Sequence, residues 1–169
     1  MSARDEVDDL VEAWGRERPD LDTSPMQVFS RVDRLARHVD RARAAAFDRH
    51  DLEGWEFDVL AALRRSGEPY RASPSALVRA TGVTSGTMTN RVDRLAARGL
   101  VSRDSDPDDR RSVRVALTDA GRTTVDGALV DLLAAERELL AGLAEPHRRD
   151  LADALRRLLG SYAAGSADG

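Results

Sequence analysis

Cysteine is absent from the 169 residues of this chain. Its absence excludes disulfide bonds, thiolate metal sites, cysteine nucleophiles and thiol-based redox sensing together. Aromatic residues make up only 4% of the chain, which leaves few large side chains to anchor the core of a monomer. We therefore expect the chain to associate with itself.

Long apolar runs are missing too. No stretch approaches the roughly 18 consecutive apolar residues of a membrane-spanning helix. The first six residues, Met-Ser-Ala-Arg-Asp-Glu, are acidic in balance and lack the apolar stretch of a signal peptide. We expect a cytoplasmic protein with no membrane partner.

Lysine is also absent, so all 26 basic residues are arginine, and the net charge is −4. The charge is unevenly distributed: residues 64–114 hold 11 arginines against 6 acidic residues, a net charge of +5, and the rest of the chain carries −9. A basic middle segment can meet a phosphate backbone while acidic ends face elsewhere. Charge alone leaves the alternative of a solvated, charge-rich surface open.

Residues 84–98 have the pattern of a capped amphipathic helix. Met88, Val92, Leu95 and Ala96 cluster on one side at about 100° per residue, and that side is expected to pack inward. The opposite side carries small and polar residues: Gly86, Thr87, Asn90, Asp93, Arg94 and Ala97. This face suits hydrogen bonding to base edges, and Gly99 favours the end of the helix at the C′ position.

The preceding and following segments predict a winged helix-turn-helix. Ser73 and Pro74 start a short helix to residue 79 or 80, and residues 81–83 form a tight turn into the second helix, with Thr84 as its N-cap. Residues 70–72 are expected to be extended. Residues 100–103 and 112–117 alternate as paired strands do, with residues 104–111 as the loop between them.

Further amphipathic helices are expected on both sides of this unit. They cover residues 3–15, ended by Gly15, residues 25–49, capped by Ser24, and residues 54–65. Beyond residue 118, which is a cap, leucines form two helical stripes separated at Pro146, and the chain is expected to fray from Gly160. The stripes expose more apolar surface than the middle unit can cover, so we expect a second copy to pack on them. A monomeric helical cap is the alternative.

The expected fold is therefore mainly α: a winged helix-turn-helix with a small β-hairpin wing and a helical dimerisation region. Residues 1–53 are interpreted as an N-terminal extension and first dimerisation helix, and residues 54–121 as the DNA-binding lobe. Residues 122–169 are interpreted as C-terminal dimerisation helices with a frayed tail.

Several motifs together resemble the MarR family of bacterial transcriptional regulators over roughly residues 25–160. They are Glu56-Phe57-Asp58-Val59-Leu60, Ser75-Ala76-Leu77, residues 84–95, Gly99-Leu100-Val101, Asp108-Asp109-Arg110-Arg111-Ser112 and Leu117-Thr118-Asp119-Ala120-Gly121. The resemblance implies a homodimeric repressor of a pseudo-palindromic, double-stranded operator, with recognition helices in major grooves about 34–36 Å apart. A winged-helix dimer that binds proteins without sequence-specific DNA binding is the alternative.

The predicted DNA contacts lie on the helix and the wing. Asn90 suits adenine and Arg94 suits guanine, with Ser85, Gly86 and Thr87 approaching from the first turn and Arg98 reaching phosphate. The resemblance implies that Asp109 and Arg111 form the wing motif Asp-x-Arg, whose arginine enters the minor groove. An ordinary charged hairpin loop is the alternative for the wing.

A ligand site is also predicted. Arg91 lies on the flank of the helix, and Trp14, Asp58, Arg91 and Arg103 match a urate-responsive MarR subgroup with an extra N-terminal helix. The match implies a small, anionic, planar effector held by two guanidinium groups. The alternative is a structural ion pair between Asp58 and Arg91, with Trp14 as a packing anchor.

No converging set of catalytic residues is found, so no enzymatic activity and no cofactor are expected. Residues 82–86 lack a P-loop lysine, and Ser, His and Asp residues do not form a nucleophile-elbow pattern. His38, His50 and His147 are far apart in the sequence, so no metal site is expected.

Overall fold

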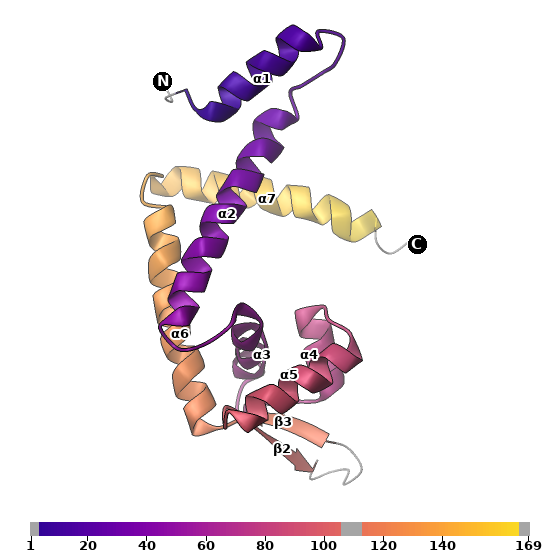
Figure 1. Ribbon diagram of the computed structural model, residues 1–169, viewed down its shortest axis with the longest axis vertical. Coiled ribbons are helices and arrows are strands. Elements are labelled where there is room, and N and C mark those ends of the chain that lie inside the picture. Colours follow the sequence, from indigo (N-terminus) through magenta and orange to yellow (C-terminus); the bar gives the residue numbers. More distant parts are fainter. Residues whose placement is uncertain (1–3, 106–112, 166–169) are drawn as a thin grey trace.

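The computed structural model describes residues 4–105 and 113–165 (Figure 1). The helices are α1 (Glu6–Glu17), α2 (Met26–Asp48), α3 (Gly54–Arg65), α4 (Pro74–Thr81), α5 (Ser85–Ala97), α6 (Asp119–Leu139) and α7 (Glu145–Gly165). The strands are β1 (Arg71–Ala72), β2 (Val101–Ser105) and β3 (Val113–Leu117). The predicted mainly α winged helix-turn-helix with flanking helices is confirmed.

A compact lobe at one end of the molecule contains α3, α4, α5 and the sheet (Figure 1). Its core is formed by buried side chains from all three helices and the sheet, including Leu60, Leu77, Met88, Leu95 and Val115. The last turn of α2 belongs to the same core, because Phe47 stacks on Phe57 with ring centroids 4.3 Å apart. The long helix α2 is therefore rooted in the lobe.

The sheet places β3 between β1 and β2, with both neighbours antiparallel to it. β2 and β3 are the expected wing strands, and the short segment predicted to be extended pairs with β3 through Arg71 opposite Ala116. Thr118 caps α6 as predicted, since its hydroxyl accepts the N–H of Gly121 at 2.9 Å. The chain thus passes from the wing directly into the long helix α6.

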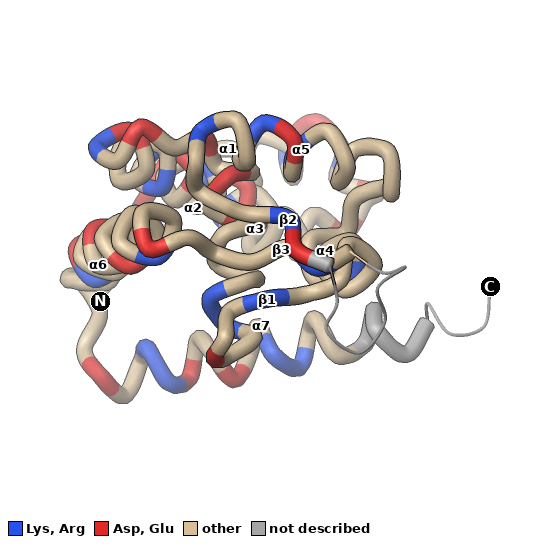
Figure 2. Tube along the Cα trace, turned by 90° about the horizontal axis from the view of Figure 1, so that it is seen from below, with Lys and Arg blue, Asp and Glu red and all other residues tan. Residues whose placement is uncertain are grey.

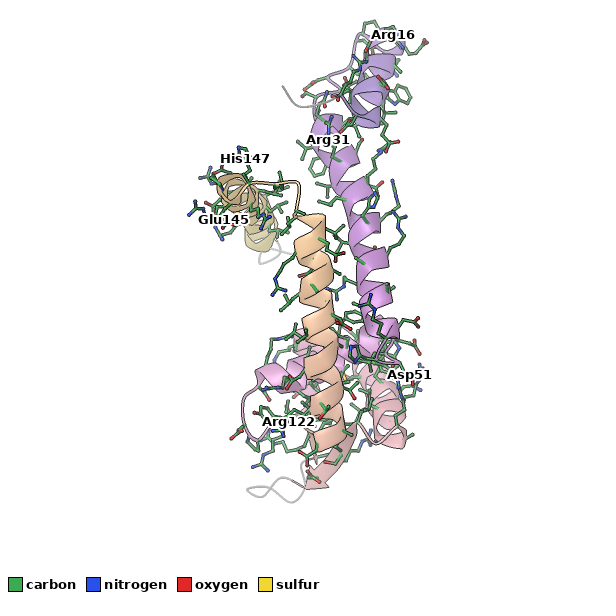
Figure 3. The ribbon with its side chains drawn as sticks, turned by 90° about the vertical axis from the view of Figure 1, so that its left-hand side faces the viewer. Arg16, Arg31, Asp51, Arg122, Glu145 and His147 are labelled. Atoms are coloured by element: carbon green, nitrogen blue, oxygen red, sulfur yellow. The ribbon has the colours of Figure 1, made fainter. Side chains whose placement is uncertain are left out.

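α2 and α6 lie side by side as an arm that extends from the lobe (Figures 1 and 3). In Figure 3, Asp51 marks the lobe end of the arm, and Glu145 and His147 mark the start of α7 towards the other end. α7 crosses the direction of α2 (Figure 1). Large apolar side chains stay exposed on these helices: Val28, Phe29, Val32, Leu35, Leu129, Leu133, Leu139, Leu140, Leu151, Leu155 and Leu159.

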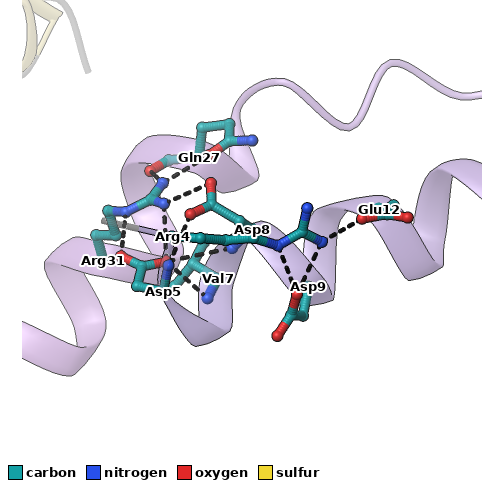
Figure 4. A network of polar contacts seen from close by, with 8 residues as sticks. All are labelled: Arg4, Asp5, Val7, Asp8, Asp9, Glu12, Gln27 and Arg31. Atoms are coloured by element: carbon teal, nitrogen blue, oxygen red, sulfur yellow. Dashed lines mark hydrogen bonds and ion pairs between the residues drawn. The ribbon is translucent and has the colours of Figure 1, made fainter. Parts of the chain in front are cut away.

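α1 is attached to the outer end of α2 by a network of charges (Figure 4). The guanidinium of Arg31 donates to Asp5 at 2.8 Å and to Asp8 at 2.9 Å, and it also donates to the side chain of Gln27 at 2.6 Å. Asp5 is at the same time the N-cap of α1 and accepts the N–H of Val7. The residue that starts α1 therefore also holds it on α2.

Three predicted helix ends are wrong. Ser24 does not cap α2, because Pro25 occupies the N-cap position and no side chain caps this helix. α1 continues past Gly15 to Glu17, where an ion pair between Arg16 and Glu12 spans the turn, and the cost of one helical glycine, about 1 kcal/mol, does not end a helix. α7 likewise continues past Gly160 to Gly165.

None of the helices in the described part of the chain combines the length and apolarity that a membrane crossing requires.

Candidate nucleic-acid interface

α5 presents two different faces, as its sequence predicts. The hydroxyl of Thr84 accepts the N–H of Thr87 at 3.3 Å and starts the helix, and Gly82 in the preceding turn has φ +68°. Met88, Val92 and Leu95 are buried in the lobe. The predicted DNA-contacting side is exposed along its length: Ser85, Gly86, Thr87, Asn90 and Arg94. The helix-turn-helix therefore offers small and polar groups to a partner.

A shallow hollow of about 550 Å³ lies between this face and the start of α3. Gly86, Thr87, Asn90, Arg91 and Arg94 line it from α5, and Glu53 and Trp55 line it from the other side. The sequence predicts the residues of the first group at the interface except Arg91, which it assigns to the ligand site, and it misses the second group. Trp55 packs only in part against the core of the lobe.

Arg94 is held at two points. Its Nη2 donates to Oε1 of Glu53 at 2.7 Å, and its guanidinium carbon lies 4.6 Å from the centroid of the Trp55 ring. The other carboxylate oxygen of Glu53 accepts the indole N–H of Trp55 at 2.7 Å. Arg91 lies over the same ring at 5.4 Å. The two arginines on the exposed part of α5 therefore share one aromatic side chain.

Arg98 is turned towards the protein. Its Nη1 donates to the buried carboxylate of Glu56 at 2.6 Å, and its Nη2 donates to Oδ2 of Asp51 at 2.7 Å. These bonds give Arg98 a structural role that the sequence did not predict, since both acids come from the corner between α2 and α3. A phosphate contact by Arg98 remains a prediction.

Basic and acidic positions are mixed on the lobe as seen from below (Figure 2). On its other flank α5 is joined to β2, where Arg103 forms an ion pair of 2.6 Å with Asp93. A hydrogen bond of 3.5 Å from Arg103 to the carbonyl of Thr89 adds to this link. Charged pairs thus fix α5 to two of its neighbours, the start of α3 and the wing.

The predicted wing contacts, Asp109 and Arg111, lie outside the described residues. The strands that lead to this loop, β2 and β3, pair in the register Ser105 opposite Val113.

The four residues predicted to hold an effector do not meet within one chain. Trp14 is exposed on α1, at the end of the molecule opposite the lobe (Figure 1). Arg91 lies over Trp55, and Arg103 pairs with Asp93. Within one chain α2 separates α1 from the lobe by its whole length, and the predicted effector site stays a prediction.

Asp58 occupies a different cavity. It forms an ion pair of 3.5 Å with Arg43 instead of the alternative pair with Arg91. Both line a cavity of about 380 Å³ between α2, α3 and α6, whose other charged groups include Arg64, paired with Asp126 at 2.8 Å. Its apolar lining includes Phe57, Leu129 and Leu133.

In the described part of the chain, no group of His, Asp or Glu side chains is placed to hold a metal ion.

The capped second helix, its exposed polar face and the adjoining wing strands define a winged helix-turn-helix protein of the DNA-binding type. The model of the MarR family matches residues 50–112. The chain is 40% identical over 155 residues to the HTH-type transcriptional regulator PecS of Dickeya dadantii, a match that covers 92% of this chain and 91% of PecS. The chain belongs to the MarR family, and it is a DNA-binding transcriptional regulator.

Other relatives agree with this assignment. The HTH-type transcriptional repressor NicR of Pseudomonas putida is 35% identical over 113 residues, covering 64% of this chain and 70% of NicR. A solved structure describes the regulation of DNA binding of Bordetella bronchiseptica BpsR by 6-hydroxynicotinic acid. It matches with a TM-score of 0.59 and 30% identity over 75% of this chain and 91% of that one. The predicted family and the predicted DNA-binding function are confirmed.

Proposed function

We propose that this chain is a homodimeric repressor that binds a pseudo-palindromic operator, with one α5 in the major groove of each half-site. The observation that supports the proposal most directly is the division of α5 into a buried apolar face and an exposed face carrying Asn90 and Arg94. A recognition helix needs this division because one side must pack on the lobe while the other meets base edges. The proposal assigns the protein no catalytic activity.

Base reading is assigned to two side chains one turn apart. Asn90 can bond bidentately to adenine, and Arg94 can do so to guanine. Ser85, Gly86 and Thr87 belong to the first turn of α5 and are exposed, so they approach the DNA backbone or the base edges. Replacing Arg94 by Ala is expected to cost about 1–3 kcal/mol at one base position, whereas a uniform loss across sequences would assign Arg94 to phosphate.

Selection of bound fragments from random duplex DNA tests the operator. We expect an inverted repeat whose half-sites are about one helical turn apart, since two-fold symmetric proteins place two recognition helices at this spacing. Binding to random duplex is expected to weaken steeply as salt rises, because phosphate contacts release counterions. Binding with no salt dependence would favour the protein-interaction module instead. A reporter gene placed behind the selected operator separates repression from activation.

The second copy is assigned to the apolar surface of α2 and α7. Leu151 and Leu155 face Val28, Val32 and Leu35 across an open groove of about 740 Å³, which a single chain leaves unfilled. Exposed apolar area of this kind indicates association. Leu155→Arg is expected to turn the dimer into a monomer in sedimentation velocity. Arg157→Glu, on the opposite side of α7, is the control and should leave the dimer intact.

We infer that a small anionic ligand modulates DNA binding, as 6-hydroxynicotinic acid does in BpsR. Within one chain, the cavity between α2, α3 and α6 is the candidate site, because it combines an apolar floor with three arginines, although three carboxylates line it as well: Arg43, Arg64 and Arg65 with Asp58, Asp126 and Glu136. A ligand there would touch both the arm and the lobe, so it could change the spacing of the two recognition helices. Three of the predicted effector residues lie outside this cavity: Trp14, Arg91 and Arg103. Contacts made in a dimer could bring them to a ligand bound there.

Calorimetry with urate, xanthine and 6-hydroxynicotinate tests the effector. The cavity is supported as the effector site if a ligand changes the operator affinity of the unmodified protein and no longer binds to Arg43→Ala. Loss in Arg91→Ala with retention in Arg43→Ala assigns the ligand to the flank of α5 instead. Absence of heat and of any change in operator affinity removes the proposal for these ligands.

A further inference from the structure

Glu53 and Trp55 form a cradle for Arg94, the arginine assigned to base reading. Glu53 accepts one hydrogen bond from Arg94 at 2.7 Å and a second from the indole N–H of Trp55 at 2.7 Å. The ring of Trp55 lies 4.6 Å from the guanidinium carbon of Arg94. The guanidinium of Arg94 is therefore held at its edge by the carboxylate of Glu53 and at its face by the ring of Trp55. The carboxylate and the ring are also hydrogen-bonded to each other.

A carboxylate at this place is unfavourable for DNA binding in itself. Glu53 is exposed and lies beside the face of α5 that meets the nucleic acid, so its charge repels the phosphate backbone. Glu53 is the N-cap residue of α3 and forms a capping box with Glu56, but its carboxylate is exposed, whereas that of Glu56 is buried. The other side chains that bond to the Glu53 carboxylate are Arg94 and the ring that lies against Arg94.

The geometry leaves Arg94 able to bind a base. A guanidinium carries five N–H donors, and the contact with Glu53 uses one of them. A bidentate contact with O6 and N7 of guanine requires two donors in one plane and one direction, whereas a phosphate oxygen accepts from many side-chain conformations. A held arginine therefore favours one base edge, and a free arginine favours the nearest phosphate.

We infer that Glu53 and Trp55 are positioning residues that determine the base preference of Arg94. The inference rests on the proposed function, in which Arg94 reads a base. Neither residue needs to touch DNA for this role, since both act through the orientation of the guanidinium. The carboxylate of Glu53 then improves the discrimination between bases. Its negative charge at the same time weakens the general attraction of the protein to the phosphate backbone.

Glu53→Gln tests the inference, because it removes the charge and keeps the size of the side chain. Discrimination between the selected operator and the same operator changed at the base pair read by Arg94 is expected to fall about tenfold. Affinity for random duplex is expected to rise, and the salt dependence to steepen by about one phosphate contact. Glu68→Gln, elsewhere on the lobe, is the control for the loss of one charge and should leave discrimination unchanged.

A double-mutant cycle with Arg94→Ala separates positioning from a general charge effect. If Glu53 acts through Arg94, Glu53→Gln has no further effect on discrimination in the Arg94→Ala background. Equal strengthening of operator and random binding by Glu53→Gln would overturn the inference, because it would show simple repulsion. If Arg94→Ala changes no base preference, the base contact itself is wrong and the inference fails with it. If Arg94→Ala changes the preference and Glu53→Gln does not, only the inference is wrong.

Two variants at Trp55 test the ring without the charge. Trp55→Phe retains an aromatic face and is expected to keep most of the discrimination, whereas Trp55→Leu is expected to lose it. Thermal unfolding of both variants identifies any loss of fold. Equal discrimination in folded Trp55→Leu and in the unmodified protein would overturn the part assigned to the ring.

Discussion

Nη1 of Arg98, in the cap of α5, donates a hydrogen bond of 2.6 Å to Oε2 of Glu56 in the first turn of α3, a residue that is only 1% exposed. The same carboxylate oxygen accepts the backbone N–H of Glu53 at 2.9 Å. The bond to Glu56 raises the pKa of Arg98 above its ordinary value, so the guanidinium is charged at every pH of interest. The end of the recognition helix is thus fixed to the corner from which the long arm departs.

Replacing Arg98 by Ala is expected to destabilise the protein by about 2–4 kcal/mol, because it leaves the buried carboxylate of Glu56 without a cationic partner. Urea-induced unfolding measures this change. Arg79→Ala, at an exposed position of α4, is the control and should change the stability by less than about 0.5 kcal/mol. A loss as small as that of the control would show that the ion pair contributes little.

The carboxyl group of Glu53 should stay ionised at unusually low pH. Hydrogen bonds from Trp55 and then from Arg94 hold its pKa below the ordinary value of 4.5. A carboxyl group whose pKa is lowered by folding stabilises the protein above its unfolded-state pKa and loses that contribution as the pH falls through the folded-state pKa. The contact with Arg94 is therefore complete at neutral pH and breaks only in acid.

The NMR signal of the Trp55 indole N–H reports this titration. Its midpoint is expected below 4.5 and should move upward in Arg94→Ala. The indole of Trp14, on α1 at the other end of the molecule, is the internal control. A midpoint that does not respond to the removal of Arg94 would contradict the contact.

Two glycines in helices should respond in opposite ways to replacement by alanine. At Gly121 a Cβ atom would lie 2.0 Å from the backbone oxygen of Leu100, so Gly121→Ala is expected to destabilise the protein by about 3 kcal/mol. At Gly86 a Cβ atom meets nothing within 4 Å, so Gly86→Ala is expected to stabilise the protein by about 0.5–1 kcal/mol.

Gly86→Ala also tests the interface. If α5 approaches DNA closely at its first turn, the variant binds the operator more weakly although it is more stable. Thermal unfolding and operator titration on the same preparation separate the two effects. Unchanged operator affinity would remove Gly86 from the contact surface.

Replacing Arg31 by Ala is expected to loosen α1 without affecting the lobe. Arg31 joins Asp5 and Asp8 to α2, and its hydrogen bonds lower the pKa of Asp5. Amide exchange in residues 6–17 is expected to rise about threefold to tenfold, since exposed ion pairs contribute modestly and α1 is short. Arg37→Ala, which breaks a pair with Asp33 within α2, is the control. Equal exchange in both variants would show that apolar contacts hold α1.

The sequence by itself determined the local structure and the family. Helix caps and left-handed glycines depend only on residues nearby in the chain, so the sequence pattern is enough to predict them. This holds for the caps at Ser73, Thr84 and Thr118 and for Gly82 and Gly99. The division of α5 into two faces follows from its 3.6-residue period in the same way. These local signals explain why the helix-turn-helix and the exposed position of Asn90 and Arg94 were predictable.

The tertiary structure alone decided which charges meet. Glu53 lies 41 positions before Arg94 and Glu56 lies 42 before Arg98, so no periodicity connects them. The same is true of the predicted effector residues: Asp58 forms an ion pair with Arg43, and Trp14 lies at the far end of the arm. A helical wheel shows the direction in which an arginine points, but the partner it meets depends on how α3 packs beside α5. For that physical reason the face that reads DNA was visible in the sequence, and the cradle that holds Arg94 on it was not.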